Sequence, residues 1–207
     1  DGDYDLVVGE SDGTLSYYEN DGSDSFTQDN YFGSIDVGDR SVPSVIDWDA
    51  DGDFDLVVGD IDGTLNFYEN DGSDSFTETT SFGSIDVGDL SAPAIVDWDS
   101  DGDYDLIVGE NDGTLNFYEN DGSDSFTETT DFASIDVGAE STPFVIDWDL
   151  DGDYDLIVGE KSGNLNYYEN DGSDSFTEMI GFGSMDVGKS SVVSSVDWDS
   201  DGDNDLV

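Results

Sequence analysis

The chain has 207 residues and an extreme acidic balance, with 54 aspartate and glutamate residues against 3 lysine and arginine residues and a formal net charge of −51. So few basic side chains exclude a nucleic-acid partner, because nothing could displace counterions from phosphates. The chain contains neither cysteine nor histidine, which excludes disulfides, thiol chemistry, zinc sites and histidine-based acid–base catalysis.

Hydrophobic residues make up 35% of the chain and include 12 Phe, 10 Tyr and 4 Trp, which is enough for a packed core. No apolar segment approaches the roughly 20 residues that a membrane-spanning helix needs, so we expect no membrane insertion. Residue 1 lies within a repeated motif, and we expect any signal peptide or anchor to lie outside these 207 residues. The charge would make the compact state repel itself unless cations neutralise it, so we expect bound metal, a saline medium or both.

A period of 50 residues organises the whole chain. The tripeptide Asp-Gly-Asp recurs, without insertions or deletions, at Asp1, Asp51, Asp101, Asp151 and Asp201. The sequence Tyr-Glu-Asn-Asp-Gly-Ser-Asp-Ser-Phe recurs from Tyr18, Tyr68, Tyr118 and Tyr168. Because turns and apolar positions repeat together, each unit is expected to have the same local structure.

Residues 91–140 illustrate one unit. Short runs of apolar and β-branched residues predict four antiparallel strands, over residues 92–98, 104–108, 114–119 and 126–130. Asn-Asp-Gly at 111–113 and again at 120–122 predicts tight turns before the third and fourth strands. No window shows helical periodicity, so the fold class is predicted to be all-β.

The second predicted strand decides how the sheets are arranged. Its residues Leu106, Ile107 and Val108 are apolar on both faces, so the sheets must stack on one another. Radial stacking gives a β-propeller, and linear stacking gives a rod. We predict a β-propeller built of four 50-residue, four-stranded blades, with an open linear stack of the same blades as the alternative.

Residues 1–207 are predicted to form a single repeat domain. Three blades would cover residues 41–90, 91–140 and 141–190. The fourth would be a composite of residues 191–207 and 1–40, because residues 1–40 lack the first strand of a unit and the segment after residue 190 supplies one. Residues 201–207 repeat the register of residues 1–7, so one of these copies would be displaced or given to a neighbouring molecule.

An Asp-rich loop is the strongest chemical signal. The pattern Asp-x-Asp-x-Asp-Gly-Asp-x-Asp is complete at residues 47–55, 97–105, 147–155 and 197–205. Oxygen ligands at alternate positions suit a hard cation, and calcium fits better than magnesium, which prefers a smaller octahedral shell and keeps several waters. Strands flank the loop and its twelfth position carries no glutamate, so it is not an EF-hand.

In such a loop the first three aspartates, Asp47, Asp49 and Asp51, can point their carboxylates inward. Gly52 permits the sharp turn and Asp53 can offer its carbonyl oxygen. Asp55 then closes the ligand shell. The loop therefore predicts about one calcium ion per repeat.

These motifs resemble the FG-GAP or VCBS-type repeats of integrin α-subunit propellers and of bacterial or archaeal surface proteins. The resemblance covers the whole chain and rests on the loop, on Asp-Leu-Ile-Val-Gly at 105–109, on Gly-Thr-Leu-Asn-Phe-Tyr-Glu-Asn at 113–120 and on Ser-Ala-Pro at 91–93. It implies a propeller blade with calcium between the first and second strands, and the same roles carry over to every complete loop. The implied ligands are Asp47, Asp49, Asp51, Asp53, Asp55, Asp97, Asp99, Asp101, Asp103, Asp105, Asp147, Asp149, Asp151, Asp153, Asp155, Asp197, Asp199, Asp201, Asp203 and Asp205, with Asp1, Asp3 and Asp5 matching the last part of a loop.

The acidic loops and the tryptophans each have a second interpretation. The loops could be acidic turns of a salt-adapted surface, but their spacing and repetition favour calcium. The tryptophans each stand between two candidate ligands, at Trp48, Trp98, Trp148 and Trp198. That position favours core packing over an exposed platform for stacking sugars.

The net charge also has two interpretations. Four calcium ions would neutralise only a small part of it, and the rest serves either solvation in brine or divalent bridging between molecules.

We expect no enzyme activity, no catalytic residues and no cofactor other than Ca²⁺. A catalytic carboxylate pair is usually unique, whereas the glutamates that could supply one have identical surroundings at Glu19, Glu69, Glu119 and Glu169. We instead expect an extracellular structural or adhesive protein, secreted or at the cell surface, in a medium that contains calcium and can also be saline. It would form filaments or a surface layer by end-strand exchange with other copies or neighbouring repeats. The alternative is a calcium-dependent, lectin-like carbohydrate-binding module that recognises surface glycans.

Overall fold

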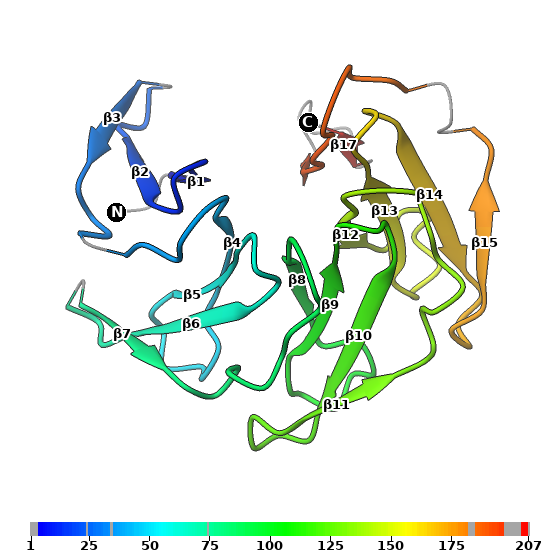
Figure 1. The fold of residues 1–207 in the computed structure, drawn as a ribbon, viewed down its shortest axis with the longest axis horizontal. Helices are drawn as coiled ribbons and strands as arrows, with labels where there is room; N and C mark the ends of the chain where they lie inside the picture. Colours follow the sequence, from blue (N-terminus) through cyan, green and yellow to red (C-terminus); the bar gives the residue numbers. More distant parts are fainter. Residues whose placement is uncertain are drawn as a thin grey trace. The chain divides into compact units, whose positions relative to one another are not determined.

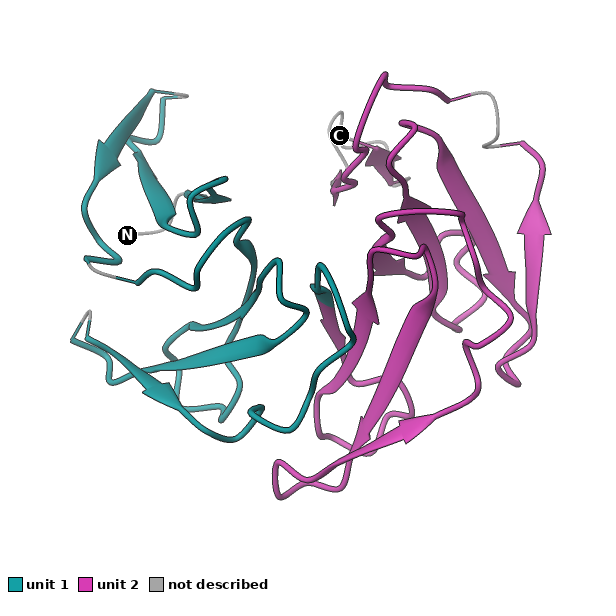
Figure 2. Ribbon diagram, in the orientation of Figure 1, with its two compact units in different colours: residues 1–93 teal, residues 94–207 magenta. Residues whose placement is uncertain are grey.

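The computed structural model describes residues 4–23, 25–33, 35–73, 75–181, 185–196 and 204–206. Every regular element within these ranges is a β-strand (Figure 1). In the same residues, no helix is long and apolar enough to cross a membrane. The chain divides into two compact units, residues 1–93 and residues 94–207 (Figure 2).

The first unit contains a three-stranded sheet and a four-stranded sheet, both antiparallel. The three-stranded sheet has the order β1 (Leu6–Gly9), β2 (Leu15–Asn20) and β3 (Phe26–Asp29). The four-stranded sheet has the order β4 (Val42–Ile46), β5 (Asp55–Gly59), β6 (Leu65–Asn70) and β7 (Phe76–Thr79). Each strand pairs with its sequence neighbour, so both sheets are simple meanders.

Two further meanders follow along the chain. One consists of β8 (Ala92–Val96), which spans the boundary between the units, β9 (Asp105–Gly109), β10 (Leu115–Asn120) and β11 (Phe126–Thr129). The next consists of β12 (Thr142–Ile146), β13 (Asp155–Gly159), β14 (Leu165–Asn170) and β15 (Phe176–Met179). A short antiparallel pair, β16 (Ser195–Val196) and β17 (Asp205–Leu206), completes the described strands.

The predicted fold class, an all-β protein built from four-stranded propeller blades, is confirmed. The four strands predicted within residues 91–140 correspond to β8, β9, β10 and β11, with ends that differ by at most two residues. Both Asn-Asp-Gly sequences lie at the predicted turns, where Gly113 and Gly122 have φ angles of 95° and 75°. The division into blades, including the composite of residues 191–207 and 1–40, stays a prediction.

The second strand of each four-stranded sheet is buried along its whole length, in β5, β9 and β13. In β9 the side chains of Leu106, Ile107 and Val108 are 0% exposed. Each such side chain contributes up to about 1.5–3 kcal/mol of hydrophobic stabilisation. Burial on both faces of the strand is what its unbroken apolar sequence predicted.

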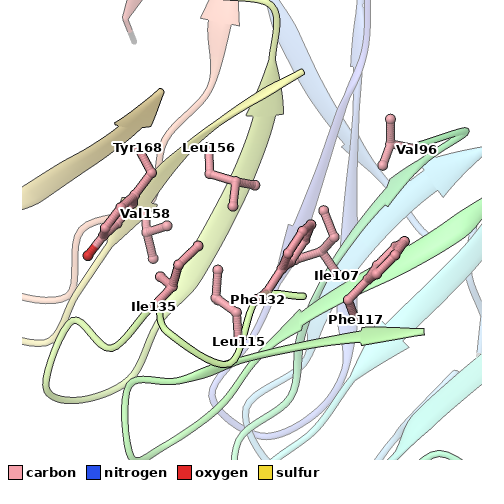
Figure 3. Close-up of a cluster of buried hydrophobic side chains, with 9 residues drawn as sticks. All are labelled: Val96, Ile107, Leu115, Phe117, Phe132, Ile135, Leu156, Val158 and Tyr168. Carbon is pink, nitrogen blue, oxygen red and sulfur yellow. The ribbon is translucent and has the colours of Figure 1, made fainter. Parts of the chain in front are cut away.

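One core of the second unit contains side chains from two successive sheets (Figure 3). Phe117 of β10 stacks on Phe132, with ring centroids 4.8 Å apart, and Leu115 and Ile135 belong to the same cluster. Leu156 of β13 lies opposite them, together with Val158 and Tyr168 of the same sheet. The successive sheets of this unit are therefore stacked face to face through interdigitated apolar side chains.

A buried serine ties the start of each sheet to the hairpin of the preceding one. Ser141, which is 2% exposed, accepts a hydrogen bond at its Oγ from the Glu110 backbone N–H (2.9 Å) and donates one to the Thr114 carbonyl (2.7 Å). A Cβ at Gly109 would lie 2.1 Å from the Ser141 carbonyl oxygen, so only glycine permits this approach. The same contacts recur at Ser41, Ser91 and Ser191.

We expect Ser141→Ala to lower the free energy of unfolding by about 1–3 kcal/mol, because it leaves a backbone N–H and a carbonyl without their side-chain partner. Chemical denaturation in excess calcium measures the change. Ser125→Ala serves as the control, since Ser125 is an exposed serine in the turn before β11. Equal stability of the two variants would contradict the role assigned to Ser141.

Candidate metal site

The Asp-rich loops lie between the first and second strands of the four-stranded sheets. The loop at residues 47–55 begins directly after β4 and ends on the first residue of β5. Its backbone makes two left-handed turns, at Ala50 (φ 59°) and Gly52 (φ 101°). Ser100 and Leu150 repeat the non-glycine left-handed conformation, which is uncommon and persists where surrounding contacts enforce it.

Aspartate side chains curl the loop by accepting hydrogen bonds from its own backbone. Asp49 Oδ1 accepts from the Asp51 N–H (3.1 Å), and Asp47 Oδ2 accepts from the Gly52 N–H (3.2 Å). Asp51 Oδ1 accepts from the Asp53 N–H (2.9 Å). Equivalent bonds form in the loops at 97–105 and 147–155. The carboxylates are therefore gathered on the inside of the turn.

This curl brings three carboxylates together in each loop, with one oxygen from each residue lying within 4.8 Å of the others. The groups are Asp47, Asp49 and Asp55; Asp97, Asp99 and Asp101; and Asp147, Asp149 and Asp155. Like charges so close repel strongly unless a cation or protons neutralise them. Each described loop is thus an acidic cluster that could bind a metal ion.

The buried oxygens of these clusters test whether a cation fits. Asp47 Oδ1 and Asp97 Oδ1 are both inaccessible to solvent and have no hydrogen-bond partner. An unsatisfied buried polar atom costs about 1–3 kcal/mol, and more when it is charged. A hard cation held by these carboxylates would satisfy both oxygens, so the residues present fit a calcium ion.

The last aspartate is the most deeply buried aspartate in the loops at 47–55, 97–105 and 147–155. Asp105 is 1% exposed and accepts hydrogen bonds from the backbone N–H groups of Trp98 (2.9 Å) and Asn120 (2.9 Å). Desolvation outweighs these bonds and raises the pKa of Asp105 to about 6. Burial likewise raises the pKa of Asp55. A bound divalent cation would reverse this effect by favouring the ionised form.

The fourth aspartate of each loop lies elsewhere. The Asp53 carboxylate lies against Gly72 in the turn between β6 and β7, where a Cβ would be 2.3 Å from Asp53 Oδ2. Gly122 and Gly172 meet Asp103 and Asp153 in the same way. None of these carboxylates joins the clusters, an arrangement compatible with ligation through the carbonyl oxygen.

An asparagine that the sequence analysis did not select supports each loop. Asn70 donates its backbone N–H to Asp55 Oδ1 (2.8 Å) and its Nδ2 to the Phe54 carbonyl (3.2 Å), and it accepts the Gly72 N–H (3.2 Å). Asn120 and Asn170 repeat these contacts. The repeated Asn-Asp-Gly carried this signal, but it was interpreted only as a turn.

The remaining predicted ligands have different positions. Asp51, Asp105 and Asp151 accept hydrogen bonds from the backbone but do not join the three-carboxylate groups. Asp5 accepts hydrogen bonds from the Tyr17 hydroxyl (2.7 Å) and the Asn20 N–H (2.8 Å), and Asp205 is an exposed residue of β17. The other predicted ligands lie outside the described residues: Asp1, Asp3, Asp197, Asp199, Asp201 and Asp203.

The tryptophans beside the first ligands pack into the cores. Trp48 meets Phe82 with ring centroids 5.0 Å apart, and Trp98 meets Phe132 at 4.9 Å. Trp148 lies 6.4 Å from Tyr167, whereas Trp198 is outside the described residues. Core packing, the interpretation that the sequence favoured, describes the rings of Trp48 and Trp98, both of which stay partly accessible.

Comparison with known proteins identifies a repeat family and a protein of similar fold. The family model described as FG-GAP-like repeat matches residues 1–58, 47–108, 97–158 and 147–207. No curated protein sequence matches the chain. A lectin from Agrocybe aegerita, described as specifically recognising non-reducing terminal N-acetylglucosamine, has a similar fold, with a TM-score of 0.52 and 19% identity. The alignment covers 98% of this chain and 56% of the lectin chain, so this chain spans about half the length of that protein.

We expect the metal-free protein to become more stable as the pH falls from 7 towards 5. The pKa of Asp105 is about 6 in the folded protein against 3.8 for its unperturbed value, so over this range the folded state binds more protons than the unfolded state, and acid favours folding. Calcium competes with protons for the same carboxylates, so its added stabilisation should shrink over the same range. Melting temperatures at pH 5, 6 and 7, with and without calcium, test both trends, and a metal-free protein that loses stability on mild acidification would contradict them.

Proposed function

Because the chain belongs to the FG-GAP-like repeat family, we propose that it is a calcium-stabilised structural or adhesive repeat protein that acts outside the cell. Calcium would be held by the acidic loop of each repeat. The observation that carries this proposal is the pair of solvent-inaccessible, unpartnered carboxylate oxygens on Asp47 and Asp97. Without a cation, such a cluster lowers the free energy of unfolding. With a bound cation, it raises the free energy of unfolding.

The requirements of the clusters support extracellular placement, secreted or at a cell surface. Their ligands are carried on exposed loops, with Asp49 and Asp99 open to solvent, and such modules commonly need the millimolar calcium found outside cells. The charge of −51 also favours a medium rich in cations. A non-enzymatic role is supported by the repetition of each acidic cluster in the same surroundings, since catalysis usually needs one distinct constellation.

Self-association, with other copies or with neighbouring repeats, is the structural role that the proposal favours. The last strands of the sheets, β3, β7, β11 and β15, each pair on one side only within their described sheets. An unpaired strand edge can add a strand from another chain. Divalent ions can also bridge acidic surfaces, which would make assembly depend on calcium.

We expect calcium to raise the melting temperature, with about 2.7 kcal/mol of added stability per site when free calcium is a hundredfold above the dissociation constant. Asp97→Asn should remove the contribution of one site. Asp131→Asn is the matched control, because it makes the same charge change at an exposed position outside the loops. Calorimetric titration and thermal melts measure both effects. A melting temperature that does not change when calcium is added would contradict the proposal.

Assembly has its own test. Sedimentation and electron microscopy of the same preparation, in calcium and after chelation, should reveal filaments or larger species only with calcium. Potassium chloride at matched ionic strength is the control for simple charge screening. Monomers under every condition would reject self-association while leaving the calcium sites untouched.

A calcium-dependent carbohydrate-binding module is the second candidate. The Agrocybe aegerita lectin, which has a similar fold, is described as recognising N-acetylglucosamine. In this chain Tyr154 is 39% exposed and lies beside Trp98. An accessible aromatic ring next to carboxylates is a common setting for sugar recognition, and this local arrangement is what favours the second candidate.

A further inference from the structure

A pocket of about 290 Å³ lies in the second unit between two acidic loops. One wall is the loop at 97–105, with Trp98, Asp99 and Ser100. The opposite wall combines the loop at 147–155, with Asp153 and Tyr154, and the turn that contains Asp174. Its volume is near the lower limit for small-molecule sites, which suits one small ring better than a long chain.

Two aromatic rings line the pocket, and contacts hold one of them in place. Trp98 donates its Nε1–H to Asp174 Oδ1 (2.8 Å), and its ring packs against Phe132 at 4.9 Å. The ring of Tyr154 lies 6.1 Å from that of Trp98 at an interplanar angle of 34°. Trp98 is fixed by these contacts, and the accessible ring of Tyr154 beside it offers an apolar surface to a ligand.

The polar walls select the charge of the ligand. The carboxylates of Asp99, Asp153 and Asp174 line the pocket, so an anionic ligand would be repelled. Asp99 also belongs to the cluster with Asp97 and Asp101, and calcium there would withdraw part of the negative charge. The carboxylate oxygens that line the pocket are then strong hydrogen-bond acceptors. They accept charge-assisted hydrogen bonds from the hydroxyl groups of a neutral ligand.

We propose that this pocket binds a single uncharged sugar ring, with its apolar face on Tyr154 and its hydroxyls donating hydrogen bonds to Asp174 and Asp99. Binding depends on calcium, because Asp99 serves both the pocket and the metal cluster. The inference rests on the carbohydrate-binding form of the proposed function. It adds the place of the site, the charge of the ligand and the coupling to the metal.

The test uses a panel of methyl glycosides, comprising a neutral hexoside, an N-acetylhexosaminide, a hexosaminide with a free amine and a hexuronide. Calorimetric or NMR titration of the full chain in calcium measures their binding. Because Tyr4 and Tyr104 occupy the position of Tyr154 in other repeats, every protein in the series carries Tyr4→Asn and Tyr104→Asn. This background isolates the pocket at Tyr154.

The variants are taken from the chain's own repeats, which limits the risk of misfolding. Tyr154→Asn copies the residue at Asn204, and Tyr154→Phe copies Phe54. Leu150→Ala is the control, since Leu150 is 65% exposed in the same loop and Ala50 has the same left-handed backbone at the equivalent position. Circular dichroism and melts in calcium confirm that each variant folds.

We expect the neutral glycosides to bind saturably in calcium and the hexuronide not to bind. Tyr154→Asn should weaken binding about three- to tenfold, as the loss of one ring contact predicts, Tyr154→Phe should weaken it less, and Leu150→Ala should not change it. Removal of calcium should abolish binding.

Four outcomes would each overturn the inference: no saturable binding, an affinity unchanged by Tyr154→Asn, an affinity unchanged by calcium removal, or tighter binding of the glycoside with the free amine. If calcium still raises the melting temperature, only the pocket is refuted, whereas loss of that response refutes the proposed function itself.

Discussion

Mutual repulsion among clustered carboxylates is the constraint on which the rest of this structure depends. Each of the three described loops holds three carboxylates with oxygens within 4.8 Å, in a chain with a net charge of −51. Buried Asp105 accepts two backbone N–H groups and still has a raised pKa, so hydrogen bonds alone do not offset the cost of burying its charge. A cation or protons can neutralise the cluster, and the strands, turns and aromatic side chains around the loop hold the carboxylates in place for either.

The same loop connects packing to chemistry. Its last aspartate is the first residue of a fully buried strand, and the neighbouring tryptophan packs into the core beside it. The turn that follows the third strand supports the loop through Asn120 and Gly122. A cation bound at the loop would therefore stabilise three elements together: the loop itself, the second strand that follows it, and the hairpin after that strand.

Most of the local fold could be predicted from the sequence because every repeat presents the same signals. Apolar runs gave the strands to within two residues, and Asn-Asp-Gly gave the turns. The acidic clusters were predicted from ligand spacing alone, yet the structure brings together only three of the five aspartates of each loop. Spacing could not reveal that the side chain of Asp53 turns towards Gly72, or that Asn70 holds the loop, because both depend on contacts with a turn about twenty residues away.

The buried serine at the start of each sheet has a consequence for how the chain comes apart. Ser41, Ser91, Ser141 and Ser191 each bind the hairpin of the repeat before them, so each serine links one repeat to the preceding one. Such an array behaves as a one-dimensional cooperative system, in which stability is a sum of unit and junction terms. Under tension it would yield by successive release of repeats, and a calcium-filled loop in each would make those steps sensitive to the surrounding ion concentration.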